Sequence, residues 1–281
     1  MERLVWRVGD RVLDCGKRTL VMGVLNVTPD SFSDGGQFFD PETAVSRGIG
    51  MVAEGADLID VGGESTRPGA DPVSVDEERR RVLPVIKRLA AEVDAPISID
   101  TRKADVAVAA LEAGAAIVND ISAGRDPDMF AVARDAGAGV VLMHMRGEPA
   151  TMQEFTDYVD VVAEVRDQLA VRVDEAREAG VDADRIVVDP GIGFAKTPDQ
   201  NLTLLRDVRS FFELGRPVLV GPSRKSFIGK VLDVDVEERL EGTAAAVAWL
   251  VAEGTHIVRV HDVKEMVRVI RVVEAIKRGS A

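Results

Sequence analysis

The chain has 281 residues, of which 46% are hydrophobic and 30% are charged, and its formal net charge at pH 7 is −13. This balance excludes a disordered chain, a collagen-like repeat and a coiled coil, while the length fits one large domain or two average ones. The acidic charge argues against nucleic-acid binding, because a protein that contacts a phosphate backbone normally presents a basic face.

Residues 1–18 precede the first long apolar run, and we expect them to form a short β-hairpin at one end of the fold. They contain Cys15, the single cysteine of the sequence, which excludes an intramolecular disulfide and a cysteine-based metal cluster. The segment lacks the apolar stretch of a signal peptide, and no apolar run reaches the ~20 residues that a membrane helix needs. We therefore expect a soluble, cytoplasmic protein with no membrane partner.

Short runs rich in Val, Ile and Leu then recur along the chain, and a helix-length stretch follows each of them. In chain order the runs are Leu20–Val27, Ala56–Val61, Pro96–Ile99, Ala115–Val118, Gly139–Met143, Arg185–Val188, Arg216–Val220 and Thr255–Val260. Their nearly continuous apolar character is typical of parallel strands buried on both faces. Gly180 and Gly254 predict helix ends, and Pro84 predicts a kink or a break in the second helix.

Eight strand–helix units without a flexible linker between halves predict an α/β fold. We expect a single (β/α)₈ TIM barrel over residues 19–281, preceded by the hairpin of residues 1–18. A doubly wound open sheet is the alternative. The strand–helix junctions contain neither G-x-G-x-x-G nor a P-loop, so the glycines do not indicate a dinucleotide or nucleotide site.

Polar side chains stand where nearly every predicted strand ends, and in a barrel these ends surround the active site. The set comprises Asn26, Asp100, Asn119, Asp189, Lys225, Arg259 and His261. A single Asp after a strand is more often a helix cap, but capping alone does not account for so many polar groups at one end. The sequence therefore predicts an active site at the C-terminal mouth of the barrel.

Three of these residues, Asp100, Asn119 and Asp189, supply hydrogen-bond acceptors. Such a trio suits a flat ligand with several N–H donors along its edge, because each group then escapes burial without a partner. Lys225 would add a donor and a positive charge opposite them.

Arg259 and His261 lie between the eighth strand and its helix, where backbone N–H groups and the helix dipole favour an anion. The alternative for His261 is a helix-capping or core histidine. Asn26, Thr66 and Arg67 lie in two long loops and offer an oxygen ligand with anion-binding donors. That combination fits Mg²⁺ held beside phosphates, and the alternative is a pair of loops without a ligand.

Phe32, Pro68 and Phe194 would form an apolar slot at the rim of the mouth, although single aromatic residues more often belong to a core. His144 follows a predicted strand and would line the mouth, whereas His256 opens an apolar strand and is expected to be structural. Neither H-E-x-x-H nor G-x-S-x-G occurs, which argues against a zinc protease and a serine hydrolase.

Segments at the predicted strand ends resemble the dihydropteroate synthase family of pterin-binding enzymes, the folate-pathway enzymes that sulfonamides inhibit. They are Asn26–Gly36 (NVTPDSFSDGG), Gly62–Gly69 (GGESTRPG), Ile97–Thr101 (ISIDT), Asn119–Ser122 (NDIS), Leu142–Gly147 (LMHMRG), Asp189–Phe194 (DPGIGF), Ser223–Phe227 (SRKSF) and Arg259–Val263 (RVHDV). NVTPDSFSDGG and SRKSF are the most discriminating. Ala195 departs from the family pattern, in which glycine more often follows GIGF.

The resemblance implies a transferase that condenses (7,8-dihydropterin-6-yl)methyl diphosphate with 4-aminobenzoate to give 7,8-dihydropteroate and diphosphate. It implies loss of Mg²⁺-bound diphosphate, followed by attack of the amine on a cationic pterin methylene. It also implies a homodimer formed through outer helices of the barrel.

The motif matches imply a role for each residue of the mouth. The implied catalytic residues are Asp100, Lys225 and Arg259. The residues implied to bind the pterin diphosphate are Thr66, Asp100, Asn119, Met143, Asp189, Lys225, Arg259, Val260 and His261. Those implied on the 4-aminobenzoate side are Phe32, Arg67, Pro68, Phe194, Lys225 and Ser226. Asn26 is the implied Mg²⁺ ligand.

Two other functions compete with this interpretation. A corrinoid-dependent methyltransferase would keep the pterin acceptors but lack NVTPDSFSDGG, STRPG and SRKSF, all of which are intact here. A catalytically silent paralogue would bind pterin or act as an interaction subunit, and it would be expected to lose or shorten one of the two long loops.

Overall fold

The computed structural model describes residues 4–28, 41–65 and 71–280. Its first elements are strands β1 (Val5–Val8) and β2 (Arg11–Asp14), which pair antiparallel in a two-stranded hairpin. An eight-stranded parallel sheet follows, with the strand order β8-β7-β6-β5-β4-β3-β10-β9. A parallel bridge between Val188 and Val218 joins the outer strands and closes the sheet into a barrel.

The barrel strands agree with the predicted apolar runs to within a few residues. They are β3 (Leu20–Asn26), β4 (Leu58–Gly62), β5 (Ile97–Asp100), β6 (Ile117–Asp120), β7 (Gly139–Met143), β8 (Ile186–Asp189), β9 (Leu219–Val220) and β10 (Ile257–Val260). The largest difference is at β9, which keeps two residues of the predicted five. The expected TIM barrel and its N-terminal hairpin are confirmed.

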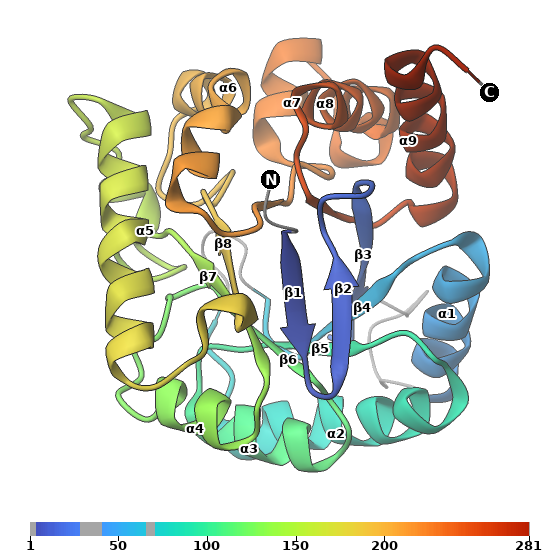
Figure 1. Cartoon of the computed structure of the whole chain (residues 1–281), viewed down its shortest axis with the longest axis vertical. Coiled ribbons are helices and arrows are strands. Elements are labelled where there is room, and N and C mark those ends of the chain that lie inside the picture. Colours follow the sequence, from blue (N-terminus) through green and yellow to red (C-terminus); the bar gives the residue numbers. More distant parts are fainter. Residues whose placement is uncertain (1–3, 29–40, 66–70, 281) are drawn as a thin grey trace.

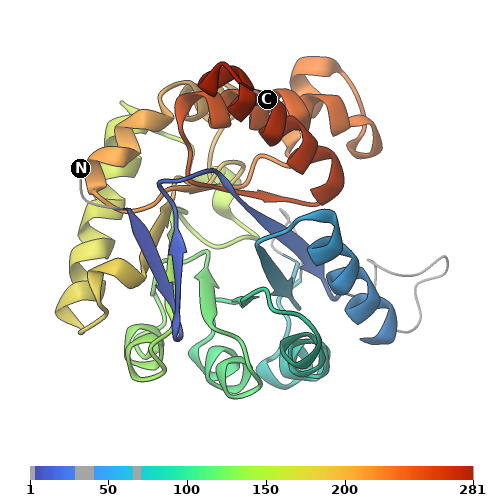
Figure 2. The same cartoon turned by 45° about the vertical axis from the view of Figure 1, so that its right-hand side comes forward.

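Helices surround the strands in a ring, as Figures 1 and 2 show. They are α1 (Pro41–Glu54), α2 (Val75–Glu92), α3 (Ala104–Glu112), α4 (Met129–Asp135), α5 (Val161–Glu178), α6 (Pro198–Arg206), α7 (Ser226–Leu232), α8 (Leu240–Glu253) and α9 (Val263–Arg278). Gly180 and Gly254 have positive φ just after α5 and α8, as predicted. Both positions therefore terminate their helices in the left-handed conformation that glycine adopts without a steric penalty.

Helix α2 continues without a break through Pro84, so the predicted break is absent. The proline removes one backbone N–H from the helix and leaves the carbonyl one turn earlier without its usual donor. Pro84 and Arg80 are both exposed. Water can therefore bind that carbonyl, which lowers the cost of a proline inside this helix.

The hairpin covers the N-terminal end of the barrel, where it crosses the opening in Figure 1. Trp6, Val8 and Cys15 pack there against the innermost apolar side chains of the strands. Trp6 is fully buried, and its indole Nε1 donates to the carbonyl oxygen of Arg185 at 2.8 Å. The polar side chains of the strands lie at the opposite, C-terminal end of the barrel.

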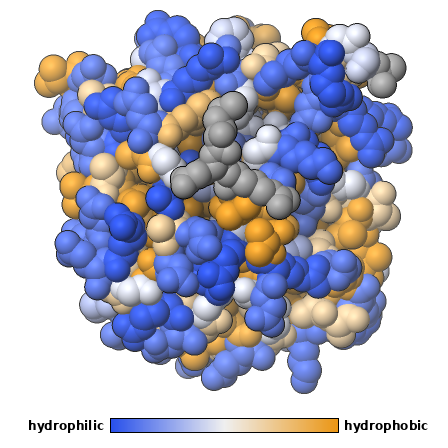
Figure 3. Space-filling view, viewed as in Figure 1, coloured by the Kyte–Doolittle hydropathy of each residue, from blue (hydrophilic) through white to orange (hydrophobic). Residues whose placement is uncertain are grey.

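Charged and polar side chains cover most of the face shown in Figure 3. Charged side chains on the outer helices form ion pairs, such as Arg80 with Glu77 at 2.7 Å and Arg88 with Glu92 at 2.8 Å. None of the described helices is both long enough and apolar enough to cross a membrane.

Candidate active site

The inner face of the barrel changes from apolar to polar along the same strands. Leu58, Ile117, Val187 and Ile257 belong to the apolar cluster under the hairpin. Because side chains two residues apart on a strand point to the same face, the next inward positions follow directly. Those positions hold Asp60, Asn119, Asp189 and Arg259. The barrel therefore has an apolar floor with a charged layer immediately above it.

The strand register places the predicted acceptors at the same height along the barrel axis. Asn26 pairs with Gly62, Gly62 with Asp100, and Asp100 with Asn119 across three neighbouring strand pairs. Asp189 pairs with Met143 on the far side of the barrel. The sequence prediction that these strand ends converge at one mouth thus agrees with the observed pairing.

Arg259 forms the centre of the charged layer. Its Nε donates to Asp60 Oδ2 at 2.6 Å, and its Nη2 donates to Asp100 Oδ2 at 2.8 Å. Burial lowers the pKa of Arg259, but the two carboxylates raise it more, so the net shift is upward. Burial also raises the pKa of Asp100 to about 7, against the opposing effect of Arg259. Burial thus disfavours the ionised form of Asp100, and the ion pair with Arg259 favours it.

Asp60 was missed by the sequence analysis, which treated it as part of an apolar strand. The side chain is fully buried, and Oδ2 also accepts a hydrogen bond from Asn119 Nδ2 at 2.8 Å. The other oxygen, Oδ1, has no hydrogen-bond partner among the described residues. An acid inside the run LIDVG, two residues before a strand end, was the signal that could have found it.

Asp189 lies at the end of β8 and is almost completely buried. Burial raises its pKa to about 6, although a hydrogen bond from the Gly191 N–H to Oδ1 at 2.7 Å acts in the opposite direction. A carboxylate in such a position favours a ligand that brings N–H donors, because these replace the lost water.

An apolar wall stands beside these acceptors. Met143 and Phe194 are buried in a small cluster at the mouth that also contains Met145 and Met152. The Lys225 ammonium lies 4.1 Å from the centroid of the Phe194 ring, which is a cation–π distance. Gly193 makes this approach possible, because a Cβ atom there would come within 2.9 Å of Lys225 Cδ.

His261 follows β10, and its neighbours define its charge state. Its backbone N–H donates to Ser223 Oγ at 3.2 Å, and its ring Nδ1 lies 3.0 Å from the same oxygen. Burial, with further contributions from Arg259 and Arg224, lowers the pKa of His261 to about 3. The imidazole is therefore neutral at pH 7, and it offers an anion a hydrogen bond rather than a positive charge.

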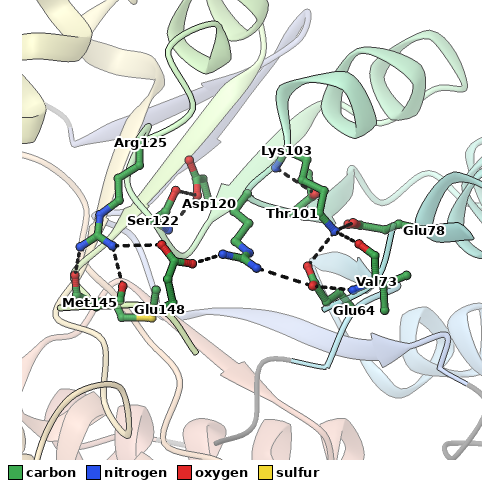
Figure 4. A network of polar contacts seen from close by, with 12 residues as sticks. Glu64, Val73, Glu78, Thr101, Lys103, Asp120, Ser122, Arg125, Met145 and Glu148 are labelled. Carbon is green, nitrogen blue, oxygen red and sulfur yellow. Dashed lines mark hydrogen bonds and ion pairs between the residues drawn. The ribbon is translucent and has the colours of Figure 1, made fainter. Parts of the chain in front are cut away.

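The rim of the mouth is held by a network of ion pairs, shown in Figure 4. Lys103 Nζ lies 3.0 Å from Glu64 Oε2 and 2.6 Å from both Glu78 Oε2 and the Val73 carbonyl oxygen. Burial raises the pKa of Glu64, but the Val73 N–H and Lys103 lower it more, so the net shift is downward. Lys103 thus connects residues 64 and 73, which flank part of the second predicted loop.

The network continues around the rim through alternating charges. Arg102 lies 3.7 Å from Glu64 and forms a second ion pair with Glu148. Arg125 lies 3.7 Å from Glu148 and donates to the Met145 carbonyl oxygen at 2.7 Å. These contacts tie the loops after β4, β5, β6 and β7 to one another.

The remaining predicted residues divide into two groups. Val260 is buried at the end of β10, Ser226 is exposed at the start of α7, and Asn26 is half-buried at the end of β3. Four predicted residues lie outside the described part of the chain, namely Phe32, Thr66, Arg67 and Pro68. Of the other histidines, His144 contacts the loop after β8, and His256 accepts from the Val218 N–H at 3.0 Å in a structural role.

A separate cleft of about 590 Å³ opens between α3 and α4, near the hairpin. It is lined largely by aliphatic residues such as Leu111, Val132 and Ala138. None of the predicted site residues lines it. Among the described residues that line the cleft, no buried polar groups converge, in contrast to the mouth of the barrel.

Comparison with known proteins agrees with this geometry. A sequence profile described as pterin binding enzyme matches residues 22–261. A dihydropteroate synthase from Synechocystis is 53% identical over 273 residues, which cover 96% of this chain and 94% of the relative. The chain belongs to the dihydropteroate synthase family. The family resemblance predicted from the strand-end motifs is confirmed.

Solved structures of dihydropteroate synthases show the same barrel. One from Xanthomonas albilineans with 4-aminobenzoic acid has a TM-score of 0.92, is 44% identical, and covers 98% of each chain. Another from the same organism, in complex with 7,8-dihydropteroate, has a TM-score of 0.88, is 41% identical, and covers 97% of this chain and 98% of that one. The chain is thus similar to dihydropteroate synthases both in sequence and in fold.

Proposed function

We propose that this chain is a dihydropteroate synthase that joins (7,8-dihydropterin-6-yl)methyl diphosphate to 4-aminobenzoate and releases diphosphate. The main support is the buried charged layer at the C-terminal mouth, in which Arg259 contacts both Asp60 and Asp100. A second support is family membership over nearly the whole chain. The 4-aminobenzoic acid and the 7,8-dihydropteroate held by the two Xanthomonas structures are a substrate and the product of this reaction.

The pterin would lie in the mouth with its N–H groups directed at Asp100, Asn119 and Asp189. These side chains are largely buried at the same end of the barrel, which makes an unpartnered acceptor costly and a matching donor favourable. Lys225 would donate to the acceptor edge of the ring. Met143 would contact the face of the ring from the apolar wall.

The guanidinium of Arg259 has two roles in this proposal. Its ion pairs with Asp60 and Asp100 fix its plane inside the mouth, where it can stack on the pterin ring. Its positive charge is largely balanced by the two carboxylates. Other donors at the mouth would therefore add to Arg259 in binding the diphosphate.

The diphosphate would bind where β10 leads into α9, against Val260 and His261. Helix α9 begins at Val263, and its N-terminal N–H groups and dipole favour a negative charge there. The neutral His261 ring can donate a hydrogen bond from Nε2 while Nδ1 faces Ser223. Thr66 would supply a further hydroxyl donor.

The 4-aminobenzoate would lie on the Phe194 side of the mouth. The Lys225 ammonium already rests over the Phe194 ring, so both an apolar surface and a positive charge are available to a benzoate. Ser226, at the exposed start of α7, would donate to the carboxylate. Phe32, Arg67 and Pro68 would complete this side.

We further propose Mg²⁺ as the cofactor, with Asn26 as its protein ligand. A Cβ atom at Gly62 would lie 3.7 Å from Asn26 Oδ1 and 3.6 Å from Asp100 Oδ2, so both oxygens lie next to the same glycine at the mouth. An amide oxygen is a hard ligand, which suits a cation that keeps several waters. When bound, Mg²⁺ would neutralise charge on the leaving diphosphate.

The residues of the chain would then act in sequence. The bond between the pterin methylene carbon and the diphosphate oxygen breaks, and the electron pair leaves with the diphosphate toward Arg259 and His261. The Asp100 carboxylate stabilises the positive charge that develops on the pterin methylene. The aniline nitrogen of 4-aminobenzoate forms the new C–N bond and loses a proton, and no strong general base is required.

A turnover assay tests the proposal directly. Purified protein is incubated with the pterin diphosphate, labelled 4-aminobenzoate and Mg²⁺, and both products are measured. We expect diphosphate and labelled dihydropteroate in equal amounts, with a strong loss of rate when Mg²⁺ is removed by EDTA. Pterin binding without diphosphate release would overturn the proposed reaction and indicate a catalytically silent paralogue.

We also propose that the enzyme is a cytoplasmic homodimer. Trp249 on α8 and Val272 and Ile276 on α9 are large apolar side chains that are exposed on outer helices. A partner copy that covered them would remove this apolar area from water. Analytical ultracentrifugation should therefore give twice the mass of one chain, and a monomer at micromolar concentration would contradict the dimer.

A further inference from the structure

A buried lysine lies within the loop that joins β8 to α6. Lys196 is 3% exposed, and its Nζ lies 3.0 Å from the Gly191 carbonyl oxygen and 2.8 Å from the Phe194 carbonyl oxygen. A third contact, at 3.1 Å, joins Nζ to His144 Nδ1, and the His144 carbonyl oxygen lies farther away at 3.5 Å. An ammonium has three N–H donors, so the three short contacts use all of them. Lys196 therefore has no donor left for a substrate.

The partner of Lys196 is held in one tautomer. His144 Nε2 lies 2.9 Å from Gln168 Oε1, an oxygen that can only accept, so Nε2 carries the ring proton. Burial and the positive charge of Lys196 lower the pKa of His144 to about 3, which keeps the ring neutral and Nδ1 free to accept. Burial lowers the pKa of Lys196, whereas the charge of Asp189 raises it and favours the ammonium form. Lys196 thus connects the β8–α6 loop to β7 through His144 and to α5 through Gln168.

The loop needs such support because its backbone is unusual. Gly191, Gly193 and Ala195 have φ values of 71°, 86° and 51°, so three residues in alternation are left-handed. Alanine is strained in this region because its Cβ comes close to the following carbonyl oxygen, and this position is the one at which the family more often has glycine. The contacts of Lys196 with the Gly191 and Phe194 carbonyls stabilise this path of the chain.

The same loop carries two groups of the site. Asp189 directly precedes it and is oriented by the Gly191 N–H. Phe194 lies within the loop and against the Lys225 ammonium. A shift of the Gly191 or Phe194 carbonyl would therefore move an acceptor of the pterin pocket and the apolar wall at the same time.

We infer that Lys196, held by the neutral His144, is a positioning residue for the condensation: it fixes the β8–α6 loop so that Asp189 and Phe194 hold the two substrates. This inference rests on the proposed function. Lys196 touches neither substrate and acts only through the loop.

The test compares steady-state kinetics of matched variants at a temperature well below their melting points. Lys196→Met keeps the aliphatic stem and removes the three donors, whereas Lys277→Met removes a lysine that donates to the Val251 carbonyl far from the mouth. We expect Lys196→Met to raise the KM of both substrates about tenfold, with a smaller change in kcat. Lys277→Met should have the KM values of the wild type.

A second pair of variants addresses the histidine and serves if Lys196→Met does not fold. His144→Leu removes the acceptor of Lys196, and His144→Gln restores one through its side-chain carbonyl. We expect KM to rise in His144→Leu and to return most of the way in His144→Gln. A lower Tm with unchanged KM values in Lys196→Met or His144→Leu would show a purely structural role and would overturn the inference.

The design separates this inference from the proposed function. If the wild type itself gives no turnover, the proposed reaction fails, and the variants are compared by their Kd for 7,8-dihydropteroate measured by calorimetry. A Kd raised about tenfold in Lys196→Met and His144→Leu would support the positioning role. Equal Kd values would overturn it.

Discussion

The two ends of the barrel are built from the same strands but have opposite character. At the N-terminal end, Leu58 and Ile117 pack under Trp6 of the hairpin and exclude water. Two residues farther along those strands, Asp60 and Asn119 are buried among charges. The first arrangement stabilises the fold, whereas the second contains carboxyl groups that burial disfavours in their ionised form. Stability and chemistry are therefore separated along the strand direction within one barrel.

The largest effect on activity is expected at the polar end, from Asp100→Asn. This change keeps the size of the side chain but removes the negative charge beside the reacting carbon. We expect kcat to fall at least about a hundredfold, as when a group that stabilises transition-state charge is removed. Affinity for diphosphate, measured by calorimetry, should change little. Near-normal turnover would show that Asp100 does not stabilise the transition state.

The matching change at the apolar end is Trp6→Ala. It removes a fully buried indole and its hydrogen bond to the Arg185 carbonyl. We expect the free energy of unfolding to fall by about 3–5 kcal/mol, measured by urea denaturation. The kcat of the molecules that stay folded should equal that of the wild type. A large loss of kcat without loss of stability would mean that the two ends are not separated.

Burial of ionisable carboxyl groups at the polar end should make the free energy of unfolding depend on pH. Because the pKa of Asp189 is raised to about 6 in the folded protein, it ionises more readily in the unfolded chain. The resulting destabilisation is absent below about pH 4, where the unfolded carboxyl is protonated, grows as the pH rises, and is complete above about pH 6.

Asp189→Asn removes this penalty. In the absence of ligand, we expect the variant to gain about 3 kcal/mol relative to the wild type between pH 4 and pH 8, because the pKa of an aspartate in an unfolded chain, about 3.9, lies well below that of the buried carboxyl. Chemical denaturation at several pH values measures the gain. If the stability difference between the two proteins does not change with pH, the burial cost has been assigned to the wrong group.

The smallest effect is expected on the outer surface. Arg80 is exposed and pairs with Glu77 within α2. Exposed ion pairs contribute little to stability, because water and salt screen them. Arg80→Ala should therefore leave both Tm and kcat unchanged within error. A clear fall in Tm at low salt would show that the surface network contributes more than such pairs usually do.

The comparison also shows which features the sequence reveals. Apolar runs mark parallel strands because burial on both faces requires them, and polar residues at the run ends then fall at one mouth. That reasoning found Asp100, Asn119 and Asp189 without coordinates. The two-residue strand β9 is shorter than its apolar run, because strand pairing depends on neighbours that are distant in the sequence.

Asp60 and Lys196 were not found because their partners are remote or are backbone atoms. Asp60 pairs with Arg259, which lies 199 positions later, so its run resembles an ordinary apolar strand until the barrel closes. Lys196 is bound by two backbone carbonyl oxygens and a histidine. Every residue has a backbone carbonyl, so the sequence does not indicate which of them will bind a lysine. Ala195 departs from the glycine that the family more often has, and its backbone is left-handed, which is the conformation that favours glycine.

A crystal structure of this chain with 7,8-dihydropteroate would test most directly whether the polar end is the pterin site. The pterin N–H groups should lie about 3 Å from the side chains of Asp100, Asn119 and Asp189, with the benzoate ring near Phe194. Product bound in the cleft between α3 and α4, or at the mouth with the pterin turned away from these acceptors, would contradict the assignment.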